Sequence, residues 1–510
     1  MNGAFTALDF VVLVVYLIAT TALGMWLGRG QKDARDYFVA DRAVPWWAIL
    51  FSVVATETSA LTFISIPGLA YATDMSFLQI AFGYLIGRMV IAYTLLPRYY
   101  QGELVTAYAL LQRRFGVATR RFASVVFMVT RAFGDSVRVF ATAIPVALIV
   151  GPFFPGAPVM PLSILLLGVF TLVYTYHGGM RAVIWTDVMQ TGVYLLGGVA
   201  ALYLLGAGVD GGWSAIVAGA GAEGKLRIVD TYAGFDRPHT IWAGLIGGAF
   251  LSMASHGADQ LIVQRLLASH NLRDARRALI GSGVVVIAQF ALFLMIGIGL
   301  HAFYKGQQFA MPDEIFPTFI VDVMPPGLTG LVIAAILAAA MSTVSGSLNS
   351  LAAATVHDLY LPLTRRSADE AGVLRVSKLF TLMWAVVLIG GAMLYRAEGT
   401  PVVTVALSIA SFTYGGLLGG FFLGMLWRRA VQRDAILGMA VGILCMTFVV
   451  FAKPLAVMMP SLGDALGPLA RIAWPWYVLI GTTITMLTGI LSSFTHPGPA
   501  VPARAQERAA

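Results

Sequence analysis

Hydroxyl-bearing residues crowd the middle of one long apolar stretch, residues 334–360, in a pattern that could bind a small cation. Ser342 and Thr343 are adjacent there, and Ala339 lies one helical turn earlier on the face that Ser342 occupies. If the stretch crosses a membrane, these hydroxyls have no water to bond and need partners in protein, ion or solute. Two hydroxyl oxygens and a nearby carbonyl could together coordinate one small hard cation.

The composition identifies the class of protein in which these residues lie. The chain has 510 residues, of which 58% are hydrophobic and only 11% are charged, whereas soluble domains carry about 25% charged residues. Apolar runs of membrane-spanning length recur from end to end, which predicts an all-α polytopic membrane protein with about thirteen transmembrane helices. The one cysteine, Cys445, excludes an internal disulfide framework and cysteine-based metal sites.

The predicted spans form a single transmembrane domain over residues 1–495. Two stretches on the outer side, 207–239 and 305–326, are too short for separate domains and predict lids or short surface helices. Residues 496–510 are rich in proline, alanine and arginine and predict a disordered cytoplasmic tail. The approximate bounds of the spans are 7–28, 44–71, 76–97, 121–150, 160–177, 181–206, 240–267, 277–304, 327–361, 374–396, 401–427, 434–453 and 472–494.

Basic residues orient the predicted bundle. The net charge is +8, and most of the 33 lysines and arginines lie in alternate loops, among them residues 29–42, 98–121 and 265–277. By the positive-inside rule this side is cytoplasmic, which places the N-terminus outside and the C-terminus in the cytoplasm of a multi-pass inner (plasma) membrane protein. The same distribution favours anchoring at the lipid bilayer over binding to nucleic acid.

Two predicted spans carry polar residues at the depth where a continuous membrane helix would be apolar. The second contains ATETSALT (55–62), and the seventh contains SMASHGADQ (252–260). Polar contacts between helices explain single serines or threonines, but they explain Glu57 or the His256–Asp259 pair poorly.

Transporters with inverted repeats have discontinuous helices at corresponding places in their two halves. The two polar spans lie five apart, as the first helix of each half would. This spacing predicts one repeat over about residues 44–206 and a second over about residues 240–427.

Several motifs in order resemble the sodium/solute symporter family, which includes sugar, proline, pantothenate and sialic acid carriers. The resemblance implies the LeuT-type fold of five-plus-five inverted repeats, with one leading and two trailing helices. It also implies that the chain is a sodium-coupled secondary active symporter, which imports a small sugar, amino acid or organic acid by alternating access. The resemblance covers about residues 7–430 and rests on DYFVADRAVPWW (36–47), SVVATETSA (52–60), PGLAY (67–71), GGMRAVIWTDVMQ (178–190), DQLIVQR (259–265), LNS (348–350) and HDLY (357–360).

The resemblance further implies which atoms bind sodium. In the family one sodium ion lies between the second and ninth spans. Matching the motifs gives the backbone carbonyls of Ala55, Thr58 and Ala339 and the hydroxyls of Ser342 and Thr343. Five neutral oxygens suit a weakly bound monovalent ion, whereas Mg²⁺ or Ca²⁺ would favour carboxylates.

A second sodium ion is less well supported by the motifs. Asp187 matches a family acid on the sodium exit path, and in some members this acid belongs to a second sodium site. Ser345 of that second site is kept, but Gly346 stands where those members have serine. One sodium ion is therefore favoured over two.

The solute is expected beside the ion, near the midplane, between spans two, three, seven and eleven. Glu57 stands where many sugar carriers have asparagine and the proline branch has an acid; it could strengthen the sodium field, carry a proton or pair with an arginine. Thr62, Ser252 and Ser255–His256 depart from the sugar-carrying pattern, which weakens a sugar-stacking interpretation. The candidates by position are Glu57, Thr62, Gln79, Tyr84, Ser252, Ser255, His256 and Thr413.

Arginines within the spans leave the charge of the solute open. Arg131 and Asp135 stand four residues apart and predict an internal ion pair. Arg88 or Arg138 could then clamp a carboxylate, or could instead pair with Glu57. His256 is predicted either as a solute ligand or as a hydrogen-bonded core residue.

Other classes of function make different demands on the sequence. A proton-coupled symporter on the same fold would use Glu57 or Asp187 as the proton carrier. A transporter-like sensor would append soluble signalling domains, and few residues follow the last predicted span. An enzyme is disfavoured, because the chain has no zinc motif, nucleophile elbow or paired catalytic acids. The sequence does not name the solute or the oligomeric state.

Overall fold

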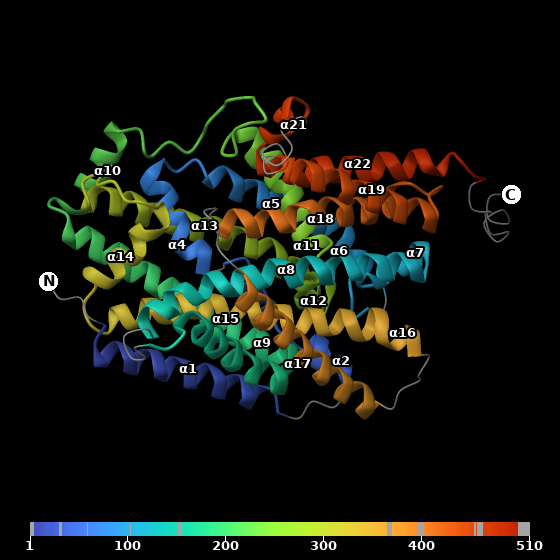
Figure 1. The fold of residues 1–510 in the computed structure, drawn as a ribbon, viewed down its shortest axis with the longest axis horizontal. Helices are drawn as coiled ribbons and strands as arrows, with labels where there is room; N and C mark the ends of the chain where they lie inside the picture. Colours follow the sequence, from blue (N-terminus) through green and yellow to red (C-terminus); the bar gives the residue numbers. More distant parts are fainter. Residues whose placement is uncertain are drawn as a thin grey trace.

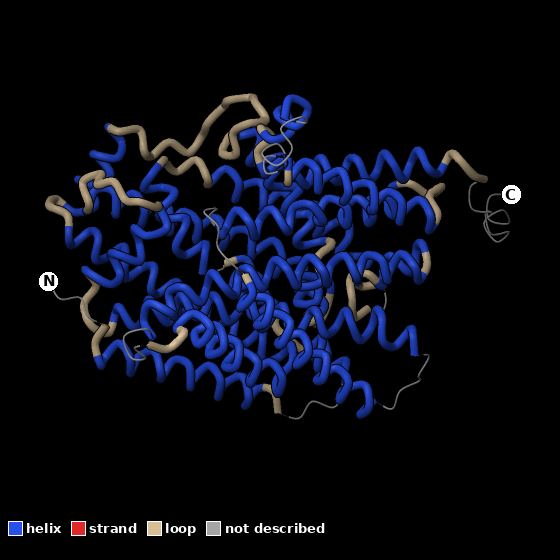
Figure 2. The backbone as a smooth tube through the Cα atoms, in the orientation of Figure 1, coloured by secondary structure: helices blue, strands red, loops and turns tan. Residues whose placement is uncertain are grey.

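The computed structural model is helical through nearly all of the chain that it describes, with loops between the helices (Figure 2). Side chains of 60–61, 145, 148–150, 370–371, 402–411 and 463–465 are not described. The predicted tail lies outside the described residues from position 498 onward. The structure describes residues 5–29, 33–58, 60–101, 104–150, 156–364, 370–395, 402–452, 455 and 463–497.

Long apolar helices lie side by side along the long axis of the molecule (Figure 1). Within the described residues, eight helices have the length and hydropathy of a membrane span, which confirms the predicted all-α polytopic class. They are α1 (Ala7–Leu27), α5 (Leu78–Tyr93) continued by α6 (Leu95–Tyr99), α9 (Val159–Gly208), α13 (Leu272–Phe303), α15 (Leu328–Ala354) with η5 (Thr355–Tyr360) and α16 (Leu361–Thr364), α17 (Glu370–Leu394), α19 (Gln432–Val450), and η7 (Trp474–Trp476) with α22 (Tyr477–Ser493).

The remaining predicted spans coincide with helices of other kinds. A bent pair, α3 (Trp46–Glu57) and α4 (Ala60–Ala72), makes a ninth candidate span. The predicted fourth and eleventh spans are α8 (Val117–Val150) and α18 (Val402–Leu426). The total number of membrane crossings stays a prediction.

The longest helix, α9, is two predicted spans joined at a glycine. Gly179 has φ 53° and ψ −150° inside the helix, a backbone conformation that side chains with a Cβ disfavour. A Cβ at this position would lie 2.4 Å from the carbonyl oxygen of Tyr37, in the short helix α2 (Ala34–Val39). The break therefore needs glycine, and it separates the predicted spans 160–177 and 181–206.

The second and seventh spans are broken, as the sequence predicts. Helix α3 ends at Glu57, and Thr58 has extended backbone (φ −84°, ψ 96°); the axes on either side of the break meet at 61°. In the seventh span, Asp259 is extended and its carboxylate accepts from the N–H of Leu261 at 2.8 Å, which caps the following helix. That span consists of η3 (Ala243–Gly247), α11 (Gly248–Gly257) and α12 (Gln260–Leu267).

Helix α15 lies at the centre of the bundle. In the most apolar stretch of α15 and its continuation, 89% of the residues are buried inside the protein, whereas in α1, at the periphery, 22% are buried. Helix α15 packs against α1, α3, α8 and α9. The trailing helices α19 and α22 pack on α18 along the opposite side from α1 (Figure 1). The hydroxyl-rich helix is therefore enclosed by protein rather than lipid.

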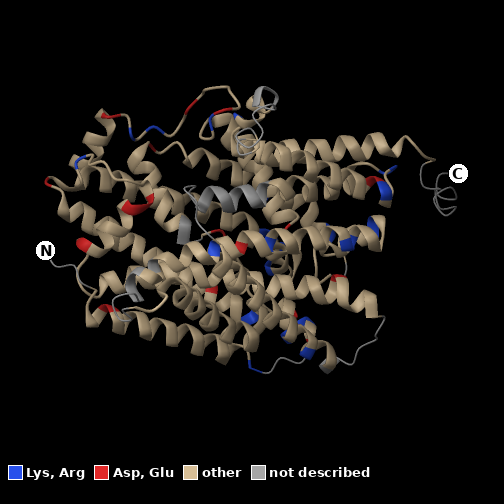
Figure 3. Cartoon of the chain, viewed as in Figure 1, with Lys and Arg blue, Asp and Glu red and all other residues tan. Residues whose placement is uncertain are grey.

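Short helices cover the two ends of the bundle. The predicted surface stretches contain α10 (Gly212–Ala222) and η4 (Pro312–Glu314) with α14 (Ile315–Asp322). At the other end lies α7 (Ala109–Phe115), and positions coloured as lysine or arginine are concentrated toward this end (Figure 3). The short helix η1 (Ala40–Arg42) precedes α3 in the chain. A further short helix, α21 (Gly463–Ala470), precedes the last span.

Candidate functional site

The residues of the predicted sodium site lie at the C-terminal end of α3 (Ala55 and Thr58) and within α15 (Ala339, Ser342 and Thr343). Helices α3 and α15 are in contact, and Ala55, Thr58, Ala339, Ser342 and Thr343 are all buried. The Thr343 hydroxyl donates to the carbonyl oxygen of Ala339 at 3.1 Å. The break at Thr58 interrupts the hydrogen bonds of the helix, so the last carbonyls of α3 have no i+4 donors within it.

Asp187 joins this cluster from α9. The Ser342 hydroxyl donates to Asp187 Oδ1 at 2.7 Å, and the Ser52 hydroxyl donates to Oδ2 at 2.5 Å. Arg265, from α12, donates through Nη2 to the same Oδ2 at 3.0 Å. The predicted exit-path acid therefore contacts a predicted sodium ligand directly.

Arg265 corrects the loop assignment made from the sequence, where it counts among the cytoplasmic basic residues. Its side chain is 0% exposed, as is that of Asp187. A buried charge needs a close counter-charge, and Asp187 supplies it. A Cβ at Gly346 would lie 2.5 Å from Arg265 Nη2, so the missing side chain at position 346 leaves the space that the guanidinium occupies.

A second polar cluster supports the break in α3. The Thr58 hydroxyl donates to the carbonyl oxygen of Val54 at 3.0 Å and accepts from Gln289 Nε2 at 2.6 Å. The Tyr194 hydroxyl donates to Gln289 Oε1 at 2.5 Å. The sequence reasoning missed Gln289 and Tyr194, although a lone amide within the apolar run of α13 was a usable signal.

The candidate solute residue Glu57 is paired with an arginine. Arg88, from α5, forms an ion pair with Glu57 and donates through Nη1 to Ser282 Oγ at 3.1 Å. His256 Nε2 lies 3.4 Å from Glu57 Oε1. The Arg88 side chain is 0% exposed and that of Glu57 is 19% exposed, so the carboxylate is the accessible member of the pair. Pairing with Glu57, rather than a free carboxylate clamp, is the role that the structure gives Arg88.

Four other candidates lie next to this pair. The Ser252 hydroxyl donates to the carbonyl oxygen of Tyr84 at 2.9 Å. His256 Nδ1 is 3.0 Å from the carbonyl oxygen of Ser252 and 2.8 Å from the hydroxyl of Ser255. A carbonyl only accepts, so Nδ1 carries the proton in this contact. His256 is thus both a hydrogen-bonded core residue and a neighbour of Glu57.

Three candidates lie apart from that group. Gln79 is fully buried and engages the outer segment, because its amide donates to the carbonyl oxygen of His239 at 3.1 Å and accepts from the N–H of Asp230 at 3.2 Å. Thr413, on α18, accepts from the Thr130 hydroxyl at 3.1 Å. Thr62 lies half-buried in the first turn of α4.

The arginines of α8 form a charge-balanced network. Arg131 pairs with Asp135 at 3.4 Å, as predicted, and also with Asp259 at the break of the seventh span. Arg138 pairs with Asp135 at 3.2 Å, and the Tyr414 hydroxyl donates to Asp259 Oδ2 at 2.6 Å. Because both arginines have carboxylate partners, the network ties α8 to the broken span instead of leaving Arg138 unpaired for a solute.

Comparison with known proteins agrees with this arrangement of two broken helices around a buried hydroxyl-rich helix. The profile of the sodium:solute symporter family matches residues 37–442. The chain belongs to this family. It is a sodium-coupled membrane symporter, as the motif resemblance predicts.

Known relatives align with most of the length of this chain. The sodium/sialic acid symporter SiaT of Proteus mirabilis is 31% identical over 86% of this chain and 89% of its own. The corresponding NanT of Aliivibrio fischeri is 29% identical over 96% and 94%. A substrate-bound outward-open structure of a Na⁺-coupled sialic acid symporter superposes with a TM-score of 0.84 at 28% identity, covering 97% of this chain and 99% of that one. Sodium-coupled monocarboxylate transporter 1 of Homo sapiens is 29% identical over 86% and 72%.

The segment that follows α10 is tethered to the broken second span. Lys225 donates to the carbonyl oxygens of Tyr71 and Thr73 at 2.7 and 3.2 Å, and Arg227 pairs with Asp74 at 2.7 Å. Burial opposes ionisation of Asp74, but hydrogen bonds from Ser76 and the Arg227 guanidinium hold its pKa below the usual value. These contacts fix residues 225–227 against the end of α4.

Proposed function

We propose that the symporter binds one sodium ion at the junction of α3 and α15, through the carbonyls of Ala55, Thr58 and Ala339 and the hydroxyls of Ser342 and Thr343. The observation that supports this proposal is the break at the end of α3, a helix that contacts the hydroxyl-rich helix α15. Both elements are buried in protein, and Asp187 adds a negative charge beside Ser342. Neutral oxygens with a nearby carboxylate attract sodium without holding it too tightly to be released.

The proposed stoichiometry of one sodium ion follows from Arg265. Asp187 is the carboxylate that a second cation near Ser342 and Ser345 would need. Its charge is already balanced by the Arg265 guanidinium, which is 3.0 Å away and occupies the space beside Gly346. A second monovalent cation there would meet a fixed positive charge at short range.

The solute site is proposed to lie against the accessible carboxylate of Glu57, among Tyr84, Ser252, Ser255 and His256. Arg88 neutralises Glu57 but is itself buried, so this surface presents acceptor oxygens to the solute. We therefore propose a small polar organic solute that carries hydroxyl or amine donors at this end. The named relatives carry sialic acids and monocarboxylates, and a hydroxylated acid of this kind has such donors.

Coupling follows from the position of the ion between two elements. Bound sodium would fix the broken backbone of α3 against α15, and Glu57 lies one residue before the break. Release of the sodium ion on the cytoplasmic side would free the backbone at the break of α3 and weaken solute binding. In the proposed orientation, with the N-terminus outside in the plasma membrane, the membrane potential adds about 2.3 kcal/mol per charge for each 100 mV to the inward movement of sodium.

Removing single hydroxyls tests the sodium site. We expect Ser342→Ala or Thr343→Ala to abolish the sodium-induced rise in melting temperature of the purified symporter, measured in sodium against equal potassium. Thr343→Ser keeps the oxygen and should retain most of the rise.

Ser350→Ala is the matched control, because Ser350 is a buried hydroxyl on the same helix that donates within it to the carbonyl oxygen of Ser347 at 3.2 Å. This variant should respond to sodium like the unmodified protein. An unchanged sodium response in both Ser342→Ala and Thr343→Ala would refute the assignment.

A further inference from the structure

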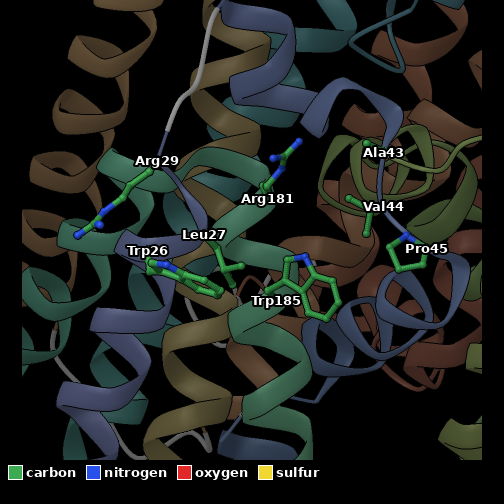
Figure 4. A pocket seen from close by; sticks show the side chains of 8 residues that line it. All are labelled: Trp26, Leu27, Arg29, Ala43, Val44, Pro45, Arg181 and Trp185. Carbon is green, nitrogen blue, oxygen red and sulfur yellow. The ribbon is translucent and has the colours of Figure 1, made fainter.

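A pocket lies at the end of the bundle away from the outer lids, between three segments that carry arginine and tryptophan. It has a volume of about 580 Å³. The C-terminal end of α1 contributes Trp26 and Arg29, residues 43–45 form a second wall, and α9 contributes Arg181 and Trp185 just after its break. Figure 4 shows Trp26, Leu27 and Trp185 beside one another, with Arg181 above them and the 43–45 segment across from Arg29.

Tryptophans place this pocket at the depth of the lipid headgroups. Helix α1 has 21 residues, about the length of one bilayer crossing, and Trp26 stands at its end. Trp26 is 63% exposed and Trp47, at the start of α3, is 39% exposed. The Trp185 ring packs edge-on against Trp47, with centroids 5.3 Å apart. Exposed tryptophans at the ends of spans are typical of the membrane interface.

The charge at the pocket mouth is positive. Arg29 is exposed and has no ion-pair partner among the residues that the structure describes. Arg181 is 41% exposed, and its contact with Asp36 is a long 3.8 Å. This end of the bundle also carries most of the basic loops (Figure 3). Two guanidinium groups beside an apolar, aromatic wall match a ligand that joins a phosphate to hydrocarbon.

We propose that this pocket binds the headgroup of an anionic membrane phospholipid in the cytoplasmic leaflet. Arg181 would bind the lipid phosphate, and Arg29, whose guanidinium points away from Arg181 in Figure 4, would attract the anionic headgroup from the other side of Trp26. Trp26, Leu27 and Trp185 would contact the glycerol and the first acyl carbons. A free phosphate compound would share the arginine contacts but would leave the apolar wall unused. The amphiphilic character of the lining therefore favours the lipid.

A ligand in the pocket would affect transport because the segments that line the pocket are connected to the broken spans and to Asp187. The N–H of Val44 donates to the carbonyl oxygen of Ala268 at 3.2 Å, so the segment that enters α3 is tied to the residue that follows α12. Asp187 lies two residues beyond Trp185 on α9. A bound lipid would thus hold together the start of the second span, the residue that follows the seventh span, and the part of α9 that precedes Asp187.

Lipid binding can be measured on the full-length symporter by native mass spectrometry. The purified protein in detergent is titrated with phosphatidylglycerol and, separately, with phosphatidylcholine of the same acyl chains. We expect stronger retention of phosphatidylglycerol, and about a fivefold loss of its apparent affinity for each of Arg29→Gln and Arg181→Gln. Arg181→Lys keeps the charge and should lose less than Arg181→Gln.

Arg273→Gln is the matched control, since Arg273 is an exposed arginine in the first turn of α13 and lies outside the pocket. It should leave phosphatidylglycerol binding unchanged. Each variant is first checked for an unchanged sodium response in melting temperature without added lipid, which separates loss of folding from loss of the pocket.

Three outcomes would overturn the proposal. The first is equal retention of the two lipids by the unmodified protein. The second is an equal loss for Arg273→Gln and the pocket variants. The third is full displacement of phosphatidylglycerol by soluble glycerol 3-phosphate, which would assign the pocket to a free phosphate compound.

Discussion

At the scale of single residues, the site is made of charges that are balanced in pairs. Asp187 with Arg265, and Glu57 with Arg88, each place a carboxylate beside the proposed ion or solute and a buried guanidinium behind it. A buried pair contributes little net stability, but losing one partner leaves an uncompensated charge. The acids can therefore face ligands because the arginines make their burial tolerable.

This balance predicts strong coupling between Glu57 and Arg88. Glu57→Gln or Arg88→Gln alone should destabilise the protein by about 3–5 kcal/mol, seen as a lower melting temperature. The double variant Glu57→Gln/Arg88→Gln should recover part of that loss, because no unpaired charge remains. Additive losses in the double-mutant cycle would contradict the pairing.

At the scale of elements, three breaks set the geometry of the site. Helix α3 ends at Glu57, the seventh span breaks at Asp259, and α9 breaks at Gly179. The first exposes carbonyls, the second orients Asp259 toward Arg131, and the third turns the helix that carries Asp187. Only the third requires one residue type, because its backbone is left-handed and in contact with Tyr37.

Gly179→Ala should therefore destabilise the symporter by about 1–3 kcal/mol and weaken its sodium response, because the strain displaces the helix that carries Asp187. Gly192→Ala, on the same helix, has open space around the added methyl group and should leave the melting temperature unchanged or raised. The measurement is the melting temperature of each variant with and without sodium. Equal melting temperatures for Gly179→Ala and Gly192→Ala would show that the break tolerates a side chain.

At the scale of the whole molecule, two sets of contacts at different levels join elements of the bundle. At one end of the bundle, Lys225 and Arg227 contact the residues at the end of the broken second span. Deeper in the bundle, Arg131 and Arg265 tie the seventh span to α8 and α9. Alternating access requires that such sets of contacts form and break in turn, with the ion site between them.

The ion pair between Arg227 and Asp74 predicts a pH dependence of stability with a definite sign. The pKa of Asp74 is lowered in the folded protein, so its stabilising effect is complete above the unfolded value of about 3.9 and is lost as pH falls through the folded value. Asp74→Asn should lower the melting temperature by the same amount at pH 6 and pH 8. The difference from the unmodified protein should shrink below about pH 4, and a difference that varied between pH 6 and pH 8 would contradict the assignment.

Much of the fold could be predicted from the sequence, because its signals are local or periodic. Apolar runs set the spans, the polar segments at Glu57 and His256 marked the two breaks, and the motifs identified the family. The five proposed sodium ligands were also named from motifs, and all five are buried on two helices that are in contact. That these residues bind sodium is a proposal, which the melting-temperature measurements in sodium and potassium test.

The pairing of charges was decided by the tertiary structure alone. Arg265 was counted as a loop residue, Arg88 as a possible carboxylate clamp or partner of Glu57, and Gln79 as a solute ligand, and each has partners on other elements. Arg138, the other possible clamp, pairs with Asp135 on its own helix. Sequence spacing predicts contacts within one helix. The Arg88–Glu57 and Gln79–His239 contacts, in contrast, join residues that are 31 and 160 positions apart. By itself the sequence determined a sodium-coupled helical symporter; which charges remain available to ion, solute or lipid was decided only by how the broken helices pack.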